Sequence, residues 1–297
     1  MIKKTLFFQN PCHISTKHQQ LVITNKETGE INKRSVEDVG FIVLDNPQIT
    51  ITQSVVQLLA ANNAAVIFCD ETHHPASMLF HLDSHQTQTE HFRAQIDATE
   101  PLKKRLWQQT VKAKIKNQAA LLDIANPPDG GNALRYMARQ VKSGDAENQE
   151  SRASRFYWSK IFGEKFSRHR FGEPPNNFLN YGYAILRAGV ARALTGSGLL
   201  PTLGIHHRNK YNAYCLADDI MEPYRPYVDY YVREIHEAGQ SSEDISTEIK
   251  RVLLEILSCD VEINGKNRPL MTGLSETTAS LVRCFKGEEK TIRYPEL

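Results

Sequence analysis

The chain has 297 residues, 40% of them hydrophobic and 24% charged, with a formal net charge of +2, which is the balance of a globular protein with one large or two smaller domains. Its first residues carry two lysines and only a short apolar run, which fits neither a signal peptide nor a membrane span, so we expect a cytoplasmic protein. Five cysteines without a CxxC pair argue against a disulfide framework and a zinc knuckle.

The first eighty or so residues predict a β-rich domain. Runs of apolar and β-branched residues predict strands at 6–9, 20–24, 40–45 and 65–69. One helix is predicted at 53–62, where an apolar stripe at helical spacing ends at Asn62-Asn63. The pattern then dissolves into polar residues around 70–91, and we place the domain boundary there. The expected domains are a β-rich one at 1–85 and a helical one at 86–297.

The second domain is predicted to be mainly helical, which makes the fold class α+β. A long helix begins at Pro101 and carries apolar residues on one side as far as Leu122. Further helices are expected at 132–142, 146–162, 177–195, 225–238 and 243–257. The segments Pro127–Gly131, Pro174-Pro175 and Gly196–Gly198 separate some of them. Asn264-Gly265 predicts the turn of a late β-hairpin.

Positive charge gathers in one part of the chain. Between Ser151 and Lys210 there are ten lysines and arginines against two acids, Glu164 and Glu173. This segment is a candidate surface for a polyanion such as DNA. A solvated basic face, compensated by acids folded against it, explains the same charge equally well.

Glu150 is the first candidate for chemistry. It shares a helical face with Ala153, Phe156, Tyr157 and Ile161, so its carboxylate should point inward. A buried charge is costly unless a metal ion or an arginine receives it. A first-turn glutamate favoured by the helix dipole is the simpler interpretation of this segment taken alone.

Two later segments add an imidazole and further acids. An apolar approach ends in His206-His207, and neighbouring side chains point in different directions, so one of the two is expected to enter a site. Asp218, Asp219 and Glu222 then follow within five positions, where they would repel one another unless a cation lies among them. Pro223 disfavours helical geometry at Glu222 and predicts a kink.

Together these segments supply two carboxylates and an imidazole, a ligand set that suits Mg²⁺ or Mn²⁺ with positions left for water and a phosphate oxygen. Such an ion stabilises the charge that develops in phosphodiester cleavage or transesterification. Because the basic segment lies between the candidate ligands, the combination favours a nuclease or strand transferase over a small-molecule hydrolase.

Five ordered motifs give the chain a family resemblance. It resembles the CRISPR adaptation integrases, the "Cas-one" family, of the type that accompanies a single large effector nuclease. The resemblance covers nearly the full length of the chain and rests on LWQQTVKAKIKNQAALL at 106–122, ESRA leading to YW at 150–158, NFLNYGY at 177–183, LGIHH at 203–207 and ADDIMEPYRP at 217–226.

The resemblance implies a metal bound by Glu150, His207 and Glu222, with Asp219 as an accessory acid. Glu222 stands where many relatives have Asp. Counting from Gly204 puts His206 in a slot usually filled by an aliphatic side chain, so His206 should point away from the two carboxylates. Candidate DNA contacts are Arg152, Arg155, Lys160, Arg168, Arg170, Arg192 and Arg208.

The resemblance also implies the partners and the reaction. The N-terminal domain would pair two subunits, and the dimer would join a small "Cas-two" subunit, with the effector nuclease as a further candidate partner. The complex would insert a captured DNA duplex into a repeat array by attack of its 3′-hydroxyl. Two alternatives stay open: a metal-dependent repair nuclease that cuts branched DNA without joining, and a DNA-binding scaffold without catalysis.

Overall fold

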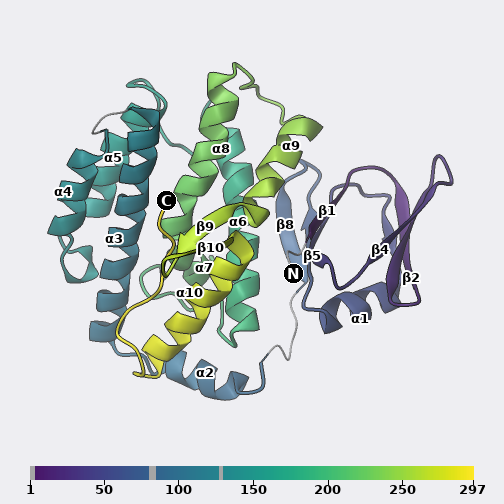
Figure 1. Ribbon diagram of the computed structural model, residues 1–297, viewed down its shortest axis with the longest axis horizontal. Coiled ribbons are helices and arrows are strands. Elements are labelled where there is room, and N and C mark those ends of the chain that lie inside the picture. The colour runs from purple at the N-terminus through teal and green to yellow at the C-terminus, as the bar shows by residue number, and fades with distance from the viewer. Residues whose placement is uncertain (1–3, 80–84, 127–129) are drawn as a thin grey trace. The chain divides into compact units, whose positions relative to one another are not determined.

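A computed structural model describes residues 4–79, 85–126 and 130–297, and the chain divides into two compact units, Met1–Ser84 and His85–Leu297 (Figure 1). Strands dominate the first unit and helices the second, which confirms the α+β class. Residues 127–129 of the predicted Pro127–Gly131 turn and residues 80–84 of the predicted boundary lie outside the described residues. In the described ranges, no helix has both the length and the apolar character needed to cross a membrane.

The first unit contains two four-stranded sheets. One has the order β1-β5-β7-β8, with β8 antiparallel to β7 and the other pairs parallel. The second has the order β4-β3-β2-β6. The strands are β1 (Lys4–Phe8), β2 (Cys12–Lys17), β3 (Gln20–Asn25), β4 (Ile31–Ser35), β5 (Val39–Leu44), β6 (Thr50–Ile51), β7 (Ala65–Cys69) and β8 (Pro75–Leu79).

The core of this unit follows from the apolar pattern. Every residue of β5 is buried, as expected for a central strand with apolar residues at successive positions. Helix α1 (Gln53–Ala61) adds Val55 and Leu59 to the same core. The sequence pattern does not predict β2, β4, β6 and β8. Strands β4 and β8 carry mostly exposed side chains, so they lack the alternation that marks a half-buried strand.

The second unit is built around the long helix α3 (Glu100–Ala125). Thr99 caps its start by accepting a hydrogen bond from Leu102 N, and Pro101 occupies the first turn. The other elements are α2 (Gln88–Ile96), α4 (Asn132–Gln140), η1 (Ser143–Asp145), α5 (Gln149–Ile161), α6 (Asn176–Gly196), α7 (Cys215–Met221), η2 (Glu222–Tyr224), α8 (Arg225–Glu237), α9 (Thr247–Leu254), η3 (Glu255–Ser258), β9 (Asp260–Ile263), β10 (Lys266–Pro269) and α10 (Leu270–Phe285).

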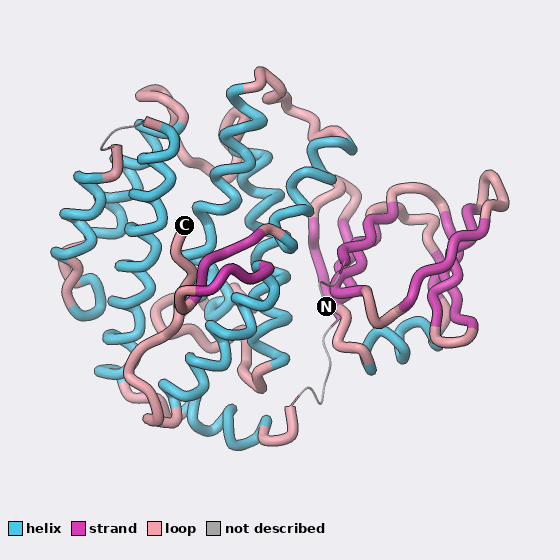
Figure 2. Tube along the Cα trace, in the orientation of Figure 1, coloured by secondary structure: helices cyan, strands magenta, loops and turns pink. Residues whose placement is uncertain are grey.

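The predicted late hairpin is confirmed, since β9 and β10 pair antiparallel around Asn264 and Gly265, which both have positive φ (Figure 2). Helices α2 and α10 are not predicted by the sequence pattern. Helix α10 buries most of its residues, and the side chains left unburied recur at helical spacing on one face: Thr272, Ser275, Glu276, Ala279 and Arg283.

Helix α3 positions the elements that carry the candidate ligands. It packs against α5, α7, α8 and η2. Its buried Asn117 donates Nδ2 to the carbonyl of Pro223 at 2.7 Å and to that of Pro295 at 2.9 Å. These bonds fix α3 against η2 and against the C-terminal segment, so the backbone around the candidate site is tied from several sides.

Candidate metal centre

Glu150 lies in the first turn of α5. Asp145 holds this helix end, because its Oδ1 accepts from Gln149 N at 2.9 Å and its Oδ2 accepts from Glu150 N at 3.0 Å. One turn later, Ser154 donates its hydroxyl to Glu150 Oε1 at 3.2 Å. Glu150 is therefore held at both its backbone N–H and its carboxylate, and 30% of its side chain is exposed.

Glu222 comes from the short turn η2, where α7 gives way to α8. The residue itself keeps helical dihedrals, with φ −51° and ψ −46°, against the prediction that Pro223 would disfavour them. Pro223 has no N–H and therefore cannot donate the next helical hydrogen bond. This agrees with the end of α7 at Met221. The Glu222 side chain is only 8% exposed, so it needs partners of opposite charge.

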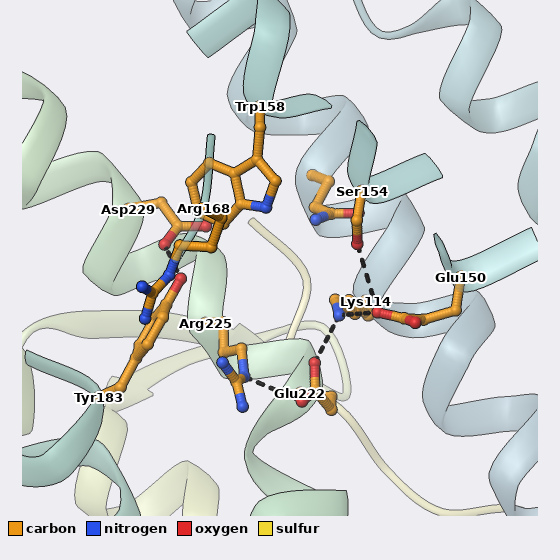
Figure 3. A pocket seen from close by; sticks show the side chains of 10 residues that line it. Lys114, Glu150, Ser154, Trp158, Arg168, Tyr183, Glu222, Arg225 and Asp229 are labelled. Atoms are coloured by element: carbon orange, nitrogen blue, oxygen red, sulfur yellow. Dashed lines mark hydrogen bonds and ion pairs between the residues drawn. The ribbon is translucent and has the colours of Figure 1, made fainter. Parts of the chain in front are cut away.

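Lys114 of α3 joins the two carboxylates. Its ammonium pairs with Glu150 Oε1 and lies 2.6 Å from Glu222 Oε2 (Figure 3). On the far side, Arg225 Nε lies 2.9 Å from Glu222 Oε1. Two predicted ligands from distant parts of the sequence thus converge on one cation.

The charges in this cluster support one another. Burial opposes ionisation of Glu222, but attraction to Arg225 and Lys114 outweighs it and holds the pKa of the carboxyl below its ordinary value. Burial likewise opposes the charged form of Lys114, yet Glu222 and Glu150 raise the pKa of its ammonium. Glu222 is thus available as a carboxylate, whose oxygens are the donors that hard divalent cations prefer.

His207 is oriented by the fully buried Asp219. Asp219 Oδ2 accepts from the backbone N–H groups of Ile205 at 2.7 Å and His206 at 2.9 Å. Its Oδ1 accepts from His207 N at 3.2 Å and lies 2.6 Å from His207 Nδ1. The loop therefore wraps around one carboxylate, that of Asp219, which lies beside the ring of His207.

Gly204 is required for this wrapping. A Cβ at position 204 would lie 2.4 Å from the His207 carbonyl oxygen and 2.7 Å from Asp219 Oδ2, which is closer than side-chain carbons approach other atoms. The glycine of the LGIHH motif thus allows the loop to close on Asp219.

His206 and His207 have different surroundings. The His206 ring lies flat on the buried Trp107, with centroids 4.1 Å apart and an interplanar angle of 1°. The His207 ring meets the edge of Trp107 at 82°. Charge interactions link His207 to Glu222 and His206 to Glu150, so both rings lie near the carboxylates.

A polar cavity opens beside the cluster. It has a volume of about 210 Å³ and is lined by Lys114, Glu150 and Glu222 on one side and by Trp158, Arg168 and Tyr183 on the other. In Figure 3 the guanidinium of Arg168 and the ring of Tyr183 lie across the cavity from Glu150. The cavity therefore combines cations and aromatic rings next to the candidate ligands.

The residues fit a divalent metal by their chemistry, although the described residues contain no ready-made group of three His, Cys, Asp or Glu side chains that could hold one. Glu222 Oε2 is a buried acceptor that receives no hydrogen bond from the described residues, since Lys114 is close but poorly aligned. Asp219 supplies the carboxylate that commonly orients a ligating histidine. The Lys114 ammonium lies between the two carboxylates, against Glu150 Oε1 and Glu222 Oε2.

The predicted DNA contacts fall into two groups. Exposed side chains are those of Arg152, Arg155, Lys160, Arg170 and Arg208, and Arg208 pairs with Glu100. Arg168 is half-buried and donates to Asn176 at 3.0 Å and Asn180 at 2.7 Å, and Arg192 is also half-buried. The first group can meet an extended polyanion, whereas Arg168 faces the cavity.

Lys114, Arg225 and Trp107 are among the residues of the site that were not predicted. Lys114 had a signal in the sequence, because it interrupts the apolar stripe of α3 three residues after Val111 and next to Ile115. A charged residue at such a position needs a buried partner.

Comparisons with known proteins agree with these features. A family model described as "CRISPR associated protein Cas1" matches residues 6–256. The chain is 34% identical over 298 residues to the CRISPR-associated endonuclease Cas1 of Neisseria meningitidis serogroup C (strain 8013), covering 100% of this chain and 97% of that protein. Its fold is similar to a casposase bound to integration product, with a TM-score of 0.78 and 18% identity over 98% of this chain and 92% of that one. It is also similar to a chain of a partial Cas6-RT-Cas1–Cas2 complex, with a TM-score of 0.66 and 21% identity over 99% of each.

Proposed function

Because the chain belongs to the Cas1 family of CRISPR-associated proteins, we propose that it is the metal-dependent DNA endonuclease and integrase of CRISPR adaptation. It inserts short captured duplexes into a repeat array, by attack of a 3′-hydroxyl on a repeat phosphodiester. Nuclease activity is the same chemistry with water as the nucleophile. The similarity in fold to a casposase that is bound to integration product supports strand transfer as the reaction.

The observation that carries this proposal is the convergence of Glu150 and Glu222 on one cation position. His207, held by Asp219, lies near enough to Glu222 for their charges to interact. Glu150, His207 and Glu222 are the ligands that we assign to Mg²⁺ or Mn²⁺. When bound, the ion supplies Lewis acidity to the phosphate and stabilises the departing alkoxide.

The protein's own residues orient the substrate. Arg225 keeps Glu222 ionised and in place, while Arg168 and Arg225, on either side of Tyr183, give the cavity wall the positive charge that a phosphate requires. The exposed cations along α5, Arg152, Arg155 and Lys160, extend this charge along the backbone of the bound DNA.

We propose the partners that the family resemblance implies. A dimer of this chain joins a small Cas2 subunit, and a captured DNA duplex and the repeat array are its substrates, in the cytoplasm. The similarity in fold to a chain of the Cas6-RT-Cas1–Cas2 complex supports this assembly. The effector nuclease of the same system is a further candidate partner.

A strand-transfer assay tests the function. A labelled short duplex is incubated with a repeat-containing plasmid, with and without the small partner, in Mg²⁺ or Mn²⁺. Joined product is expected for the wild type and none for Glu150→Ala or Glu222→Ala, because each change removes a coordinating oxygen. Circular dichroism of Glu150→Ala should match the wild type; Glu222→Ala also removes the buried partner of Lys114 and Arg225, so Glu222→Gln serves as the variant that keeps the volume of the side chain.

Other results would contradict the proposal. Cleavage of branched DNA without joining, independent of the small partner, would indicate a repair nuclease. Full strand transfer by either variant would indicate that these carboxylates are structural and that catalysis resides elsewhere.

A further inference from the structure

We propose that Lys114 is a built-in counter-ion that occupies the metal position of the metal-free protein, and that a divalent ion binds by displacing it. The proposal rests on the metal centre described under the proposed function and adds a residue to which no role has been assigned. It makes the metal affinity of the protein depend on a lysine that is not a ligand.

The position of the ammonium is the first argument. It contacts one oxygen of each predicted carboxylate ligand, Glu150 Oε1 and Glu222 Oε2, and the Lys114 side chain is 9% exposed (Figure 3). A metal ion bound by both carboxylates would need these inward-facing oxygens. Arg225 cannot take over this place, since it holds the other oxygen of Glu222 from the opposite side.

The charges give the second argument. With Lys114 and Arg225 in place, two cations face two carboxylates, so the cluster is neutral before any metal arrives. A divalent ion added beside the ammonium would be repelled at short range in a partly buried site, where charge interactions are strong. The ion and the ammonium therefore exclude each other from the space between the carboxylates.

The surroundings allow the lysine to move while the ligands stay. Asn117, one turn after Lys114, ties α3 to the carbonyl of Pro223, directly beside Glu222. The backbone frame is thus fixed, whereas Lys114 carries its charge on a flexible four-carbon stem. The cavity of about 210 Å³ that Lys114 lines, together with Arg168 and Trp158, offers the displaced ammonium a place.

Displacement also has a consequence for the substrate. An ammonium that leaves the carboxylates enters the cavity wall that already contains the guanidiniums of Arg168 and Arg225. Metal loading then adds a third cation to the region where a phosphate binds. The lysine would thereby couple metal binding to DNA binding.

Metal affinity of the full chain tests the displacement, with free Mn²⁺ measured by electron paramagnetic resonance. Lys114→Met removes the competing charge at similar volume, so its Kd for Mn²⁺ should fall at least tenfold. Lys114→Arg keeps a cation and should not bind Mn²⁺ more tightly than the wild type. Lys116→Met is the matched control: it removes an exposed lysine from the same helix and should leave the Kd unchanged.

A second measurement uses the unmodified wild type and does not depend on how well a variant folds. Lysine acetylation by a small reagent is quantified by mass spectrometry, with Lys116 as the internal reference. Mn²⁺ should increase the acetylation rate of Lys114 relative to Lys116, because the displaced ammonium leaves its ion pairs.

The outcomes separate this proposal from the proposed function. If the wild type binds Mn²⁺ and Glu150→Gln abolishes binding, the metal centre stands; an equal or weaker affinity of Lys114→Met, or unchanged acetylation of Lys114, then overturns the displacement alone. If neither the wild type nor Lys114→Met binds Mn²⁺, both proposals fail.

Discussion

His207 Nδ1 lies 2.6 Å from Asp219 Oδ1, and Asp219 is completely buried. The other partners of Asp219 in this loop are backbone N–H groups, so its oxygens act as acceptors and Nδ1 of the imidazole carries the hydrogen. The second ring nitrogen, Nε2, is then the one with a free lone pair. This hydrogen bond distinguishes His207 from His206 and orients its Nε2 as a candidate metal ligand.

The first prediction compares the two histidines. His207→Ala should abolish most strand transfer and weaken Mn²⁺ binding roughly 10- to 100-fold or more, by analogy with losses around other metal sites. His206→Ala should cost far less, because His206 packs on Trp107 and has no orienting carboxylate. Metal titration and strand transfer of both variants check this, and the reverse ranking would make His206 the ligand.

The second prediction concerns Asp219. Asp219→Asn replaces an acceptor oxygen by an NH₂ group that faces N–H donors, so the loop and the imidazole lose their support. Mn²⁺ affinity should fall roughly 10- to 100-fold. Asp218→Asn is the matched control, because Asp218 pairs with Arg187 and Asn212 instead. Equal Mn²⁺ affinities of the two variants would show that Asp219 does not orient the ligand.

The third prediction concerns DNA binding. If about five phosphates are neutralised, the logarithm of the binding constant should fall against the logarithm of salt concentration with a slope of roughly −4 to −5. Arg155→Ala should reduce the steepness by about one, whereas Lys266→Ala, an exposed cation outside the basic segment, should not. A slope near zero for the wild type would mean that this charge faces elsewhere.

The fourth prediction concerns pH. The carboxyl of Asp229 accepts hydrogen bonds from the hydroxyls of Tyr157 and Tyr183, yet burial raises its pKa from 3.8 to about 6. The folded protein therefore holds this proton more tightly than the unfolded chain, and ionisation of Asp229 makes folding less favourable as the pH rises through that range.

The size of this effect is measurable. The span from 3.8 to about 6 corresponds to roughly 3 kcal/mol at most. Urea titrations at several pH values should show the free energy of unfolding of Asp229→Asn rising relative to the wild type between about pH 4 and pH 7. A difference that does not change with pH would contradict the burial argument.

Local patterns predicted much of this protein. Periodicity and turn residues predicted the strand-rich first region, the long helix from Pro101 and the hairpin at Asn264-Gly265. Edge strands such as β4 escaped prediction because their side chains are mostly exposed, so they lack the contrast between two faces that periodicity detects. Helix α10 has that contrast, and its pattern was overlooked.

Only part of the site was predicted, because local motifs reveal single residues but not which distant segments meet. Glu150 and Glu222 were recognised from their motifs, but the cation between them comes from a third, distant helix. No local rule joins Lys114 to either acid, and the loop that folds around Asp219 depends on backbone N–H groups whose direction the sequence does not reveal.

The most direct test of the metal centre is the anomalous scattering of Mn²⁺ in crystals of the full chain. We expect one strong peak, roughly 2.1 Å from carboxylate oxygens of Glu150 and Glu222 and from Nε2 of His207, as is typical for a small divalent cation. Crystals soaked in millimolar Mn²⁺ that show no peak at these three side chains, or a peak bound by other residues, would contradict it.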